Sequence, residues 1–319
     1  MVWQKVSEKA SRTAEKGVAV IKDMTKESLF QASFEESLNL EDDGFLQYQL
    51  KEQDKKLAKF PKKGYFSLKT RLISLVLTLL FPIGLNFILV PILMVLRDDA
   101  ENLTIPISKH ELLTVEVYFC CLLIWLVFVL IGKRIKRLYL FPYRFHFHTI
   151  TYLIWLVLEF DLAGIELTLP TLTVWGILIF FMAILLLGYW MFGIKYRSIR
   201  KLLYAEKSAI TIQNKVAKIL SIYGTGILGL AVLIKQFFSI FTSGFSDSLK
   251  GLGLLLTWFI ANLAIIAMLI FLEFPYFLQA YYKWKYPEEY REWEGKSLEE
   301  WYGKKYLKKH PELLKKGLQ

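Results

Sequence analysis

Long apolar runs alternate with short polar segments along most of the chain. Residues 72–96, 112–131, 172–194, 219–241 and 252–278 are almost uninterrupted runs of hydrophobic side chains, and residues 149–167 form a further run with acidic residues in its second half. About 20 helical residues cross the hydrocarbon core of a bilayer, and a helix satisfies its own backbone hydrogen bonds there. The pattern predicts an all-α, polytopic membrane bundle with six transmembrane helices.

The basic residues gather in alternate segments between these runs. Segments 59–71, 133–144, 195–218 and 283–296 are rich in Lys and Arg, whereas the other three connections hold only Arg97, Lys109 and Lys250. Short loops rich in Lys and Arg stay on the cytoplasmic side of a membrane. The sequence therefore predicts that both termini are cytoplasmic (N-in/C-in), and the plasma membrane is the expected location.

This pattern divides the chain into three regions. Residues 1–70 form a polar, charged N-terminal region, residues 71–278 form the transmembrane domain, and residues 279–319 form a tail rich in aromatic residues and Lys. Because both ends are predicted to be cytoplasmic, the first and third regions are expected to lie on the same side of the membrane.

Each terminal region carries a helix signal. Apolar residues from Trp3 to Met24 recur at spacings of three, four or seven, which predicts an amphipathic cytoplasmic helix, followed by a charged linker that is partly flexible. Such a helix suits an anionic lipid surface, and it suits equally a protein partner or the chain's own tail. In the tail, Ser297 and Glu300 have the spacing of a capping box, which predicts the start of a short helix.

Composition and charge fit a membrane protein. Hydrophobic residues make up 55% of the 319 residues, aromatic residues make up 16%, and the formal net charge is +11. The basic residues flank the apolar runs rather than forming one stripe, which argues against a nucleic-acid-binding protein. Cys120 and Cys121 are adjacent inside an apolar run. Neighbouring cysteines rarely form a good disulfide, so no disulfide framework is expected.

Ionisable residues inside the apolar runs are the strongest candidates for a functional site, because charge is costly in lipid. Glu159 and Glu166 are seven residues apart and share a helix face, whereas Asp161 points elsewhere. Lys235 lies at a comparable depth in another run, and Glu116 lies near the exterior end of the second run. Three interpretations stay open: a cation or proton site in an outward vestibule, a structural pair of Lys235 with Glu159 or Asp161, and acids that simply reach exterior water.

Two of the runs contain residues that bend helices. Pro82, Asn86 and Pro91 lie in the first run, and Glu273 and Pro275 lie near the end of the sixth. Proline removes a backbone hydrogen bond and can kink a helix, and broken helices often line substrate sites in transporters. Gly and Pro are also common in membrane helices, and Glu273 equally suits a glutamate at the membrane boundary.

The fifth apolar run contains a glycine motif that is best explained by helix packing. Gly224, Gly226 and Gly229 have the spacing of a dinucleotide-binding loop, but they lie inside an apolar helix and lack the strand that the motif requires. Small residues let membrane helices approach closely, so these glycines are interpreted as a helix-packing surface. The sixth run offers a matching set of small residues: Ala261, Ala264 and Ala267.

No recognisable set of catalytic or metal-binding residues is present in the sequence. His146 and His148 lie close together, but a metal site needs three or four converging ligands, so neither a metal nor a cofactor is expected. The favoured function is a non-enzymatic interaction, accessory or protective (immunity-type) membrane protein, which would bind a protein partner through residues 1–55 or 279–319. The alternative is a transporter or channel subunit that uses the acidic residues for a cation, a proton or a small solute. An enzyme is favoured least, and anionic lipid at the cytoplasmic face is the expected lipid partner.

Overall fold

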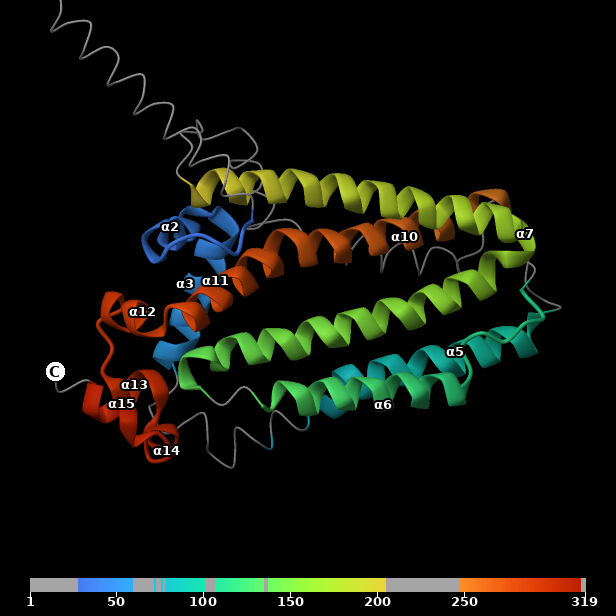
Figure 1. Cartoon of the computed structure of the whole chain (residues 1–319). Coiled ribbons are helices and arrows are strands. Elements are labelled where there is room, and N and C mark those ends of the chain that lie inside the picture. Colours follow the sequence, from blue (N-terminus) through green and yellow to red (C-terminus); the bar gives the residue numbers. More distant parts are fainter. Residues whose placement is uncertain are drawn as a thin grey trace, which may run out of the picture.

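The computed structural model describes residues 28–59, 72, 76, 78–100, 107–134, 137–204 and 247–316. Every element in these residues is a helix, which confirms the all-α prediction. Figure 1 shows long helices that run roughly side by side, with several short helices gathered at one end. The amphipathic segment 3–24 and the fifth apolar run, 219–241, lie outside the described residues.

The long helices follow the apolar runs. The π-helix η3 (Leu79–Leu85) continues into α5 (Asn86–Asp98), α6 spans Val115–Gly132, and α7 spans Phe141–Leu203. The last long element is continuous through α10 (Asp247–Met268), the π-helix η6 (Leu269–Glu273) and α11 (Phe274–Lys285). Three stretches in the described residues are long and apolar enough to cross a membrane: Val115–Gly132, Leu138–Leu203 and Leu252–Lys285.

The third and fourth predicted helices form one hairpin within α7. The chain turns back on itself there (Figure 1), three residues beyond Pro170, where Thr173 adopts φ 60° and ψ 171°. A positive φ is strained for a β-branched residue and interrupts the helix. The first half of α7 begins at Phe141 rather than at residue 149 and runs past Leu167, so the acidic residues lie well inside a helix.

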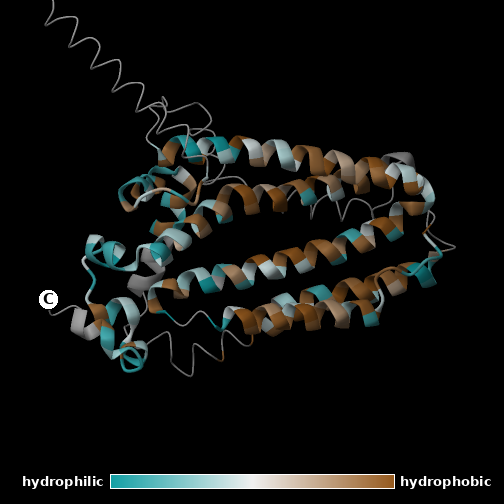
Figure 2. Ribbon diagram, in the orientation of Figure 1, coloured by the Kyte–Doolittle hydropathy of each residue, from teal (hydrophilic) through white to brown (hydrophobic). Residues whose placement is uncertain are grey.

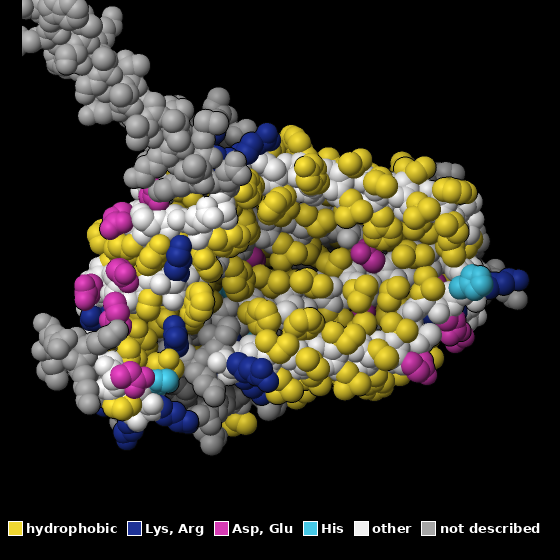
Figure 3. All heavy atoms as spheres, in the orientation of Figure 1, with side chains coloured by type: hydrophobic (Ala, Val, Ile, Leu, Met, Phe, Trp, Pro, Cys, Tyr) yellow, Lys and Arg dark blue, Asp and Glu magenta, His cyan; other side chains and the backbone are white. Residues whose placement is uncertain are grey.

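The outward faces of the long helices are apolar. On the face that Figure 3 shows, hydrophobic side chains cover most of the long helices, and most of the charged side chains lie toward the two ends (Figures 2 and 3). Trp175 and Tyr189, on the second half of α7, leave 76% and 79% of their surfaces exposed. Exposed apolar patches of this extent are rare on soluble monomers, and they are the expected surface of helices in contact with lipid.

Short helices close one end of the bundle in an assembly that we call the cap, residues 28–46 and 276–307. The N-terminal part holds α2 (Phe34–Leu38), η1 (Asn39–Asp42) and the start of α3 (Gly44–Lys59). The C-terminal part continues from α11 into three short helices: α12 (Pro287–Trp293), α13 (Leu298–Tyr302) and α14 (Lys304–Leu307). The predicted capping box of Ser297 and Glu300 is confirmed at the start of α13. The 3₁₀-helix η5 (Leu138–Leu140) packs against the cap. After α14, the chain ends its described part in α15 (Pro311–Lys316).

Tyrosines of α11 hold the N-terminal segment in place. The Tyr282 hydroxyl is fully buried; it donates to the carbonyl oxygen of Leu29 and accepts from the backbone N–H of Ala32 at 3.2 Å. The Tyr286 hydroxyl donates to the carbonyl oxygen of Ala32 at 2.9 Å. Backbone groups that leave water need such partners. Leu29 and Ala32, in the N-terminal charged region, are thus bound by α11 of the tail.

Glu41, in η1, gives the cap a specific pH dependence. Burial raises the pKa of its carboxyl above the ordinary value of 4.5, and this outweighs the attraction of Lys283. A raised pKa in the folded state means that the contribution of Glu41 to stability is fully present below pH 4.5 and is lost as the pH rises through the folded-state pKa. Glu41→Gln should therefore raise the thermal unfolding midpoint in detergent at pH 7, and the gain should vanish near pH 4. Glu289→Gln, at an exposed position of α12, is the matched control; a lower midpoint for Glu41→Gln at pH 7 would show that the Lys283 attraction dominates.

Candidate functional site

Glu159 is a fully buried carboxylate in the first half of α7. Its side chain has 0% exposure, and its Oε1 accepts a hydrogen bond of 2.5 Å from Nε1 of Trp155, one turn earlier. The other oxygen, Oε2, has no hydrogen-bond partner among the described residues. No ion pair joins Glu159 to a basic residue in the same parts of the chain.

Asn86 lies beside this carboxylate. It is the first residue of α5, directly after the π-helix that contains Pro82, and its side chain is 0% exposed. The Asn86 amide interacts with Glu159, yet neither its nitrogen nor its oxygen has a well-formed hydrogen bond within the described chain. Buried polar atoms without partners are few in native proteins, and each one calls for an explanation, such as a functional role or a bound water or ion.

Aromatic residues of α6 and α7 enclose the Glu159–Asn86 site. Tyr118 donates from its hydroxyl to the carbonyl oxygen of Ile83, in η3, at 3.1 Å. The Trp155 ring lies 5.9 Å from the Tyr118 ring and 5.5 Å from the Trp125 ring, measured between centroids. Tyr118, Trp125 and Trp155 are all buried. These aromatic side chains therefore separate the Glu159 carboxylate from the outer surface of the bundle.

Asp161 has a different environment, although it lies only two residues away. Its Oδ1 accepts hydrogen bonds of 2.8 Å from Nε1 of Trp258 and 2.8 Å from Nδ2 of Asn262, both on α10. One turn away, Gly164 lets the Trp258 ring approach so closely that an added Cβ would lie 2.4 Å from it. Asp161 therefore acts as a structural acceptor that fixes α10 against α7.

Glu166 is also satisfied by structural partners. Arg97 donates from Nε to Oε1 at 2.5 Å and from Nη2 to Oε2 at 3.0 Å, a bidentate ion pair. The backbone N–H of Leu112 donates to Oε2 at 3.0 Å, and the Glu166 carbonyl accepts from the N–H of Ser108 at 3.1 Å. Glu166 is 0% exposed, so it ties the α5–α6 connection to the bundle.

The remaining predicted residues separate into three groups. Glu116 is exposed in the first turn of α6, apart from the buried acids. Ala261 is buried on α10, which packs against α7, and Ala264 and Ala267 are half-buried. The last group lies outside the described residues, and the pairing of Lys235 with an acid stays a prediction: Lys235, Gly224, Gly226 and Gly229.

The predicted hinge residues coincide with irregular helix. Pro82 lies within η3, and Pro91 lies inside α5. Glu273 ends the π-helix η6, and Pro275 occupies the first turn of α11, where proline is tolerated. The Glu273 carboxylate oxygens lie 3.1 and 3.2 Å from Nδ1 of His146 on α7. π-Helical segments inside α-helices occur frequently at functional sites.

Several partners in these sites could not be chosen from the sequence. Trp155 lies four residues before Glu159, a spacing that is visible in the sequence, but Asn86, Tyr118 and Arg97 come from other helices. No cluster of three or more His, Cys, Asp or Glu side chains suits a metal ion within the described ranges.

Glu159 and Asn86 thus form a buried polar pair whose described partners leave hydrogen-bonding capacity unused. Comparison of the chain with protein-family models, curated proteins and solved structures finds no match. Function is therefore inferred from the geometry of this site.

Proposed function

We propose that this chain is a membrane transport protein in which Glu159 binds and releases a proton during the transport cycle. The observation that carries the proposal is the fully buried Glu159–Asn86 pair, with Oε2 of Glu159 and both amide atoms of Asn86 lacking hydrogen-bond partners in the described chain.

The energetics of a buried carboxyl favour proton binding. An ionised carboxylate in an apolar environment is costly unless a cation or several donors compensate it. Trp155 donates a hydrogen bond to Glu159 and the Asn86 amide lies beside it, but no described basic residue supplies a positive charge, so an ionised Glu159 would lack a compensating cation while the site is closed. Loss of the proton requires water or a cation at Oε2, which links the charge of Glu159 to the opening of the site.

The helix next to Glu159, formed by η3 and α5, is irregular, and an irregular helix suits a site that opens and closes. Asn86 follows a π-helix with an internal proline, and a second proline, Pro91, lies one turn further on. Interrupted helices line the central sites of many transporters. Few oxygen atoms of the described residues lie near Glu159. Because Ca²⁺ and Mg²⁺ need about six or more oxygen ligands, the site suits a proton better than either of these ions.

The interaction or protective function expected from the sequence has less support. In the described residues, segment 28–46 and the tail bind one another through α11, so these surfaces are occupied within the chain. A partner would have to bind the outer surface of the cap or residues that the structure does not describe.

The test is proton flux in liposomes that contain the purified protein and a pH-sensitive dye, driven by an imposed membrane potential. Glu159→Gln should reduce the flux to that of empty liposomes, because glutamine keeps an oxygen acceptor for Trp155 but exchanges no proton. Its thermal unfolding midpoint should be unchanged or higher, because the substitution removes a carboxyl with an unsatisfied oxygen.

Asp161→Asn is the matched control. It neutralises another acid of the same helix and keeps the oxygen that accepts from Trp258 and Asn262. Flux should persist in this variant. Equal flux in wild type and Glu159→Gln, or flux that is absent from the wild type under every imposed gradient, would refute the proposed role of Glu159.

A further inference from the structure

An apolar groove opens on the side of the bundle next to the cap. Its volume is about 270 Å³, and it lies between the start of α7 and the end of α11. Leu140, Tyr143 and Phe147 line one wall, and Phe277, Tyr281 and Trp284 line the other. The hydroxyls of the two tyrosines are engaged elsewhere, Tyr143 with Gln279 and Tyr281 with the carbonyl of Phe30, so the tyrosines present their rings to the groove.

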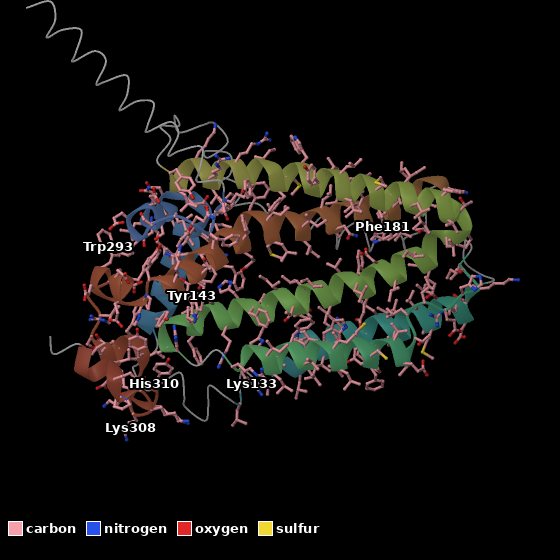
Figure 4. All side chains as sticks on the ribbon, viewed as in Figure 1. Lys133, Tyr143, Phe181, Trp293, Lys308 and His310 are labelled. Carbon is pink, nitrogen blue, oxygen red and sulfur yellow. The ribbon has the colours of Figure 1, made fainter. Side chains whose placement is uncertain are left out.

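The groove runs parallel to the helices. Its wall residues span eight positions on each side, from Leu140 at the end of η5 to Phe147 in α7 and from Phe277 to Trp284 in α11, which is about 10 Å of helix. Phe147 and Phe277 lie at the end toward the middle of the bundle, and Leu140 and Trp284 lie at the cap end. Figure 4 shows Tyr143 near the cap end of α7. An acyl chain in a bilayer has this same direction, along the transmembrane helices.

Two basic residues, Arg144 and Lys285, directly follow residues that line the groove. Arg144 follows Tyr143 and lies one turn from both Leu140 and Phe147; its guanidinium carbon is 3.9 Å from the centroid of the Phe141 ring. On the other side, Nζ of Lys285 donates to the carbonyl oxygens of Phe30 at 3.0 Å and Ala32 at 3.4 Å.

Neither of these two cations has a carboxylate partner in the described residues. Arg144 contacts the Phe141 ring and forms no ion pair with a described acid. Lys285 reaches only backbone carbonyls and aromatic rings, the nearest being Tyr286 with its centroid at 5.0 Å. Lys283, two residues before Lys285, differs because it forms an ion pair of 2.6 Å with Glu294. Arg144 and Lys285 therefore leave positive charge uncompensated beside an apolar groove.

We propose that this groove binds one acyl chain of an anionic phospholipid, and that Arg144 and Lys285 bind its phosphate. Arg and Lys at the boundary of a membrane bury their stems and direct their charges to the headgroups, and Trp284, which is 56% exposed, has the amphipathic ring favoured at that depth. The site is independent of Glu159, which lies deeper in α7 and faces α5 and α6.

The test is native mass spectrometry of the detergent-purified protein with added phosphatidylglycerol or phosphatidylcholine. Wild type should bind the anionic lipid about tenfold more tightly, since a charge-assisted hydrogen bond contributes at least this factor. Arg144→Gln with Lys285→Gln should remove the preference, so that both lipids bind equally. Ala280→Phe, which fills the groove, should weaken the binding of both lipids.

Two further measurements test whether the lipid preference depends on the proposed phosphate-binding residues. Lys304→Gln with Lys308→Gln removes two exposed tail cations and should leave the lipid preference unchanged. Because Lys285 also holds the cap, Arg144→Gln alone is measured as well, and it should lower the preference by severalfold without changing the thermal midpoint in lipid-free detergent. Equal binding of the two lipids by wild type, or a preference that survives both Arg144→Gln and Ala280→Phe, would overturn the assignment.

Discussion

Replacing Arg97 with methionine is expected to lower the free energy of unfolding by about 3–5 kcal/mol, because it leaves a buried carboxylate without its cation. Arg97 provides two of the hydrogen bonds to Glu166, at 2.5 and 3.0 Å, and Glu166 is 0% exposed. The remaining donors from the α5–α6 connection are backbone N–H groups, which carry no formal charge. The thermal unfolding midpoint in detergent should fall by several degrees or more.

A double variant separates the ion pair from simple loss of packing. Arg97→Met combined with Glu166→Gln should recover part of the lost stability, since the unpaired charge is removed. Glu111→Gln is the matched control, because Glu111 lies 3.6 Å from Arg97 but its side chain is 60% exposed. An exposed pair contributes about 0–1 kcal/mol. A loss for Glu111→Gln as large as that for Arg97→Met would contradict this account.

The second large effect is expected in the cap, at the ion pair between Asp43 and Lys195. Nζ of Lys195 lies 2.6 Å from Oδ2 of Asp43, and their side chains are 4% and 9% exposed. Asp43→Asn should cost about 3–5 kcal/mol, because it leaves the buried ammonium group unpaired. Asparagine keeps the oxygen that accepts from the N–H of Leu46 at the start of α3, so the helix cap is preserved and the charge alone is tested.

Limited proteolysis provides the readout for this pair. Cleavage within residues 28–46 should accelerate strongly in Asp43→Asn, because this segment is tied to α7 through Lys195. Lys195→Met with Asp43→Asn should restore protection in part. Lys304→Met, which breaks the exposed pair with Glu299 at 3.0 Å, should change little. Unchanged cleavage in Asp43→Asn would mean that the tyrosine contacts of α11 hold the segment without the ion pair.

The long helices could be predicted from the sequence because their signal is local. Runs of apolar residues mark α5, α6, the two halves of α7 and α10 without any knowledge of neighbours. The boundaries were less accurate: α7 begins at Phe141 because Pro142 is tolerated in a first helical turn, whereas the apolar run starts at residue 149. Likewise, α11 continues to Lys285 because a largely aromatic and apolar face, with Tyr276, Leu278 and Tyr282, is buried in the hydrophobic cluster of the cap.

The candidate site could be predicted only in part. The sequence singles out Glu159 because charge is rare in apolar helices, whereas it indicates Asn86 only as part of a predicted bend. Their proximity depends on how η3 and α5 pack against α7, which no spacing in the sequence reveals. For the same reason the sequence places Arg97 only in a connecting loop, although it forms the bidentate pair with Glu166. Similarly, the cap joins groups about 250 residues apart, such as Ala32 and Tyr282.

That separation determines the order in which the cap can form during synthesis. A ribosome adds about 5–20 residues per second, so Tyr282 emerges tens of seconds after Ala32. Until then Leu29, Leu40 and Leu46, which are fully buried in the finished protein, have no tail to cover them. The nascent chain therefore exposes an apolar segment that chaperones can bind for most of its translation. The cap can close only after the last helices have been synthesised.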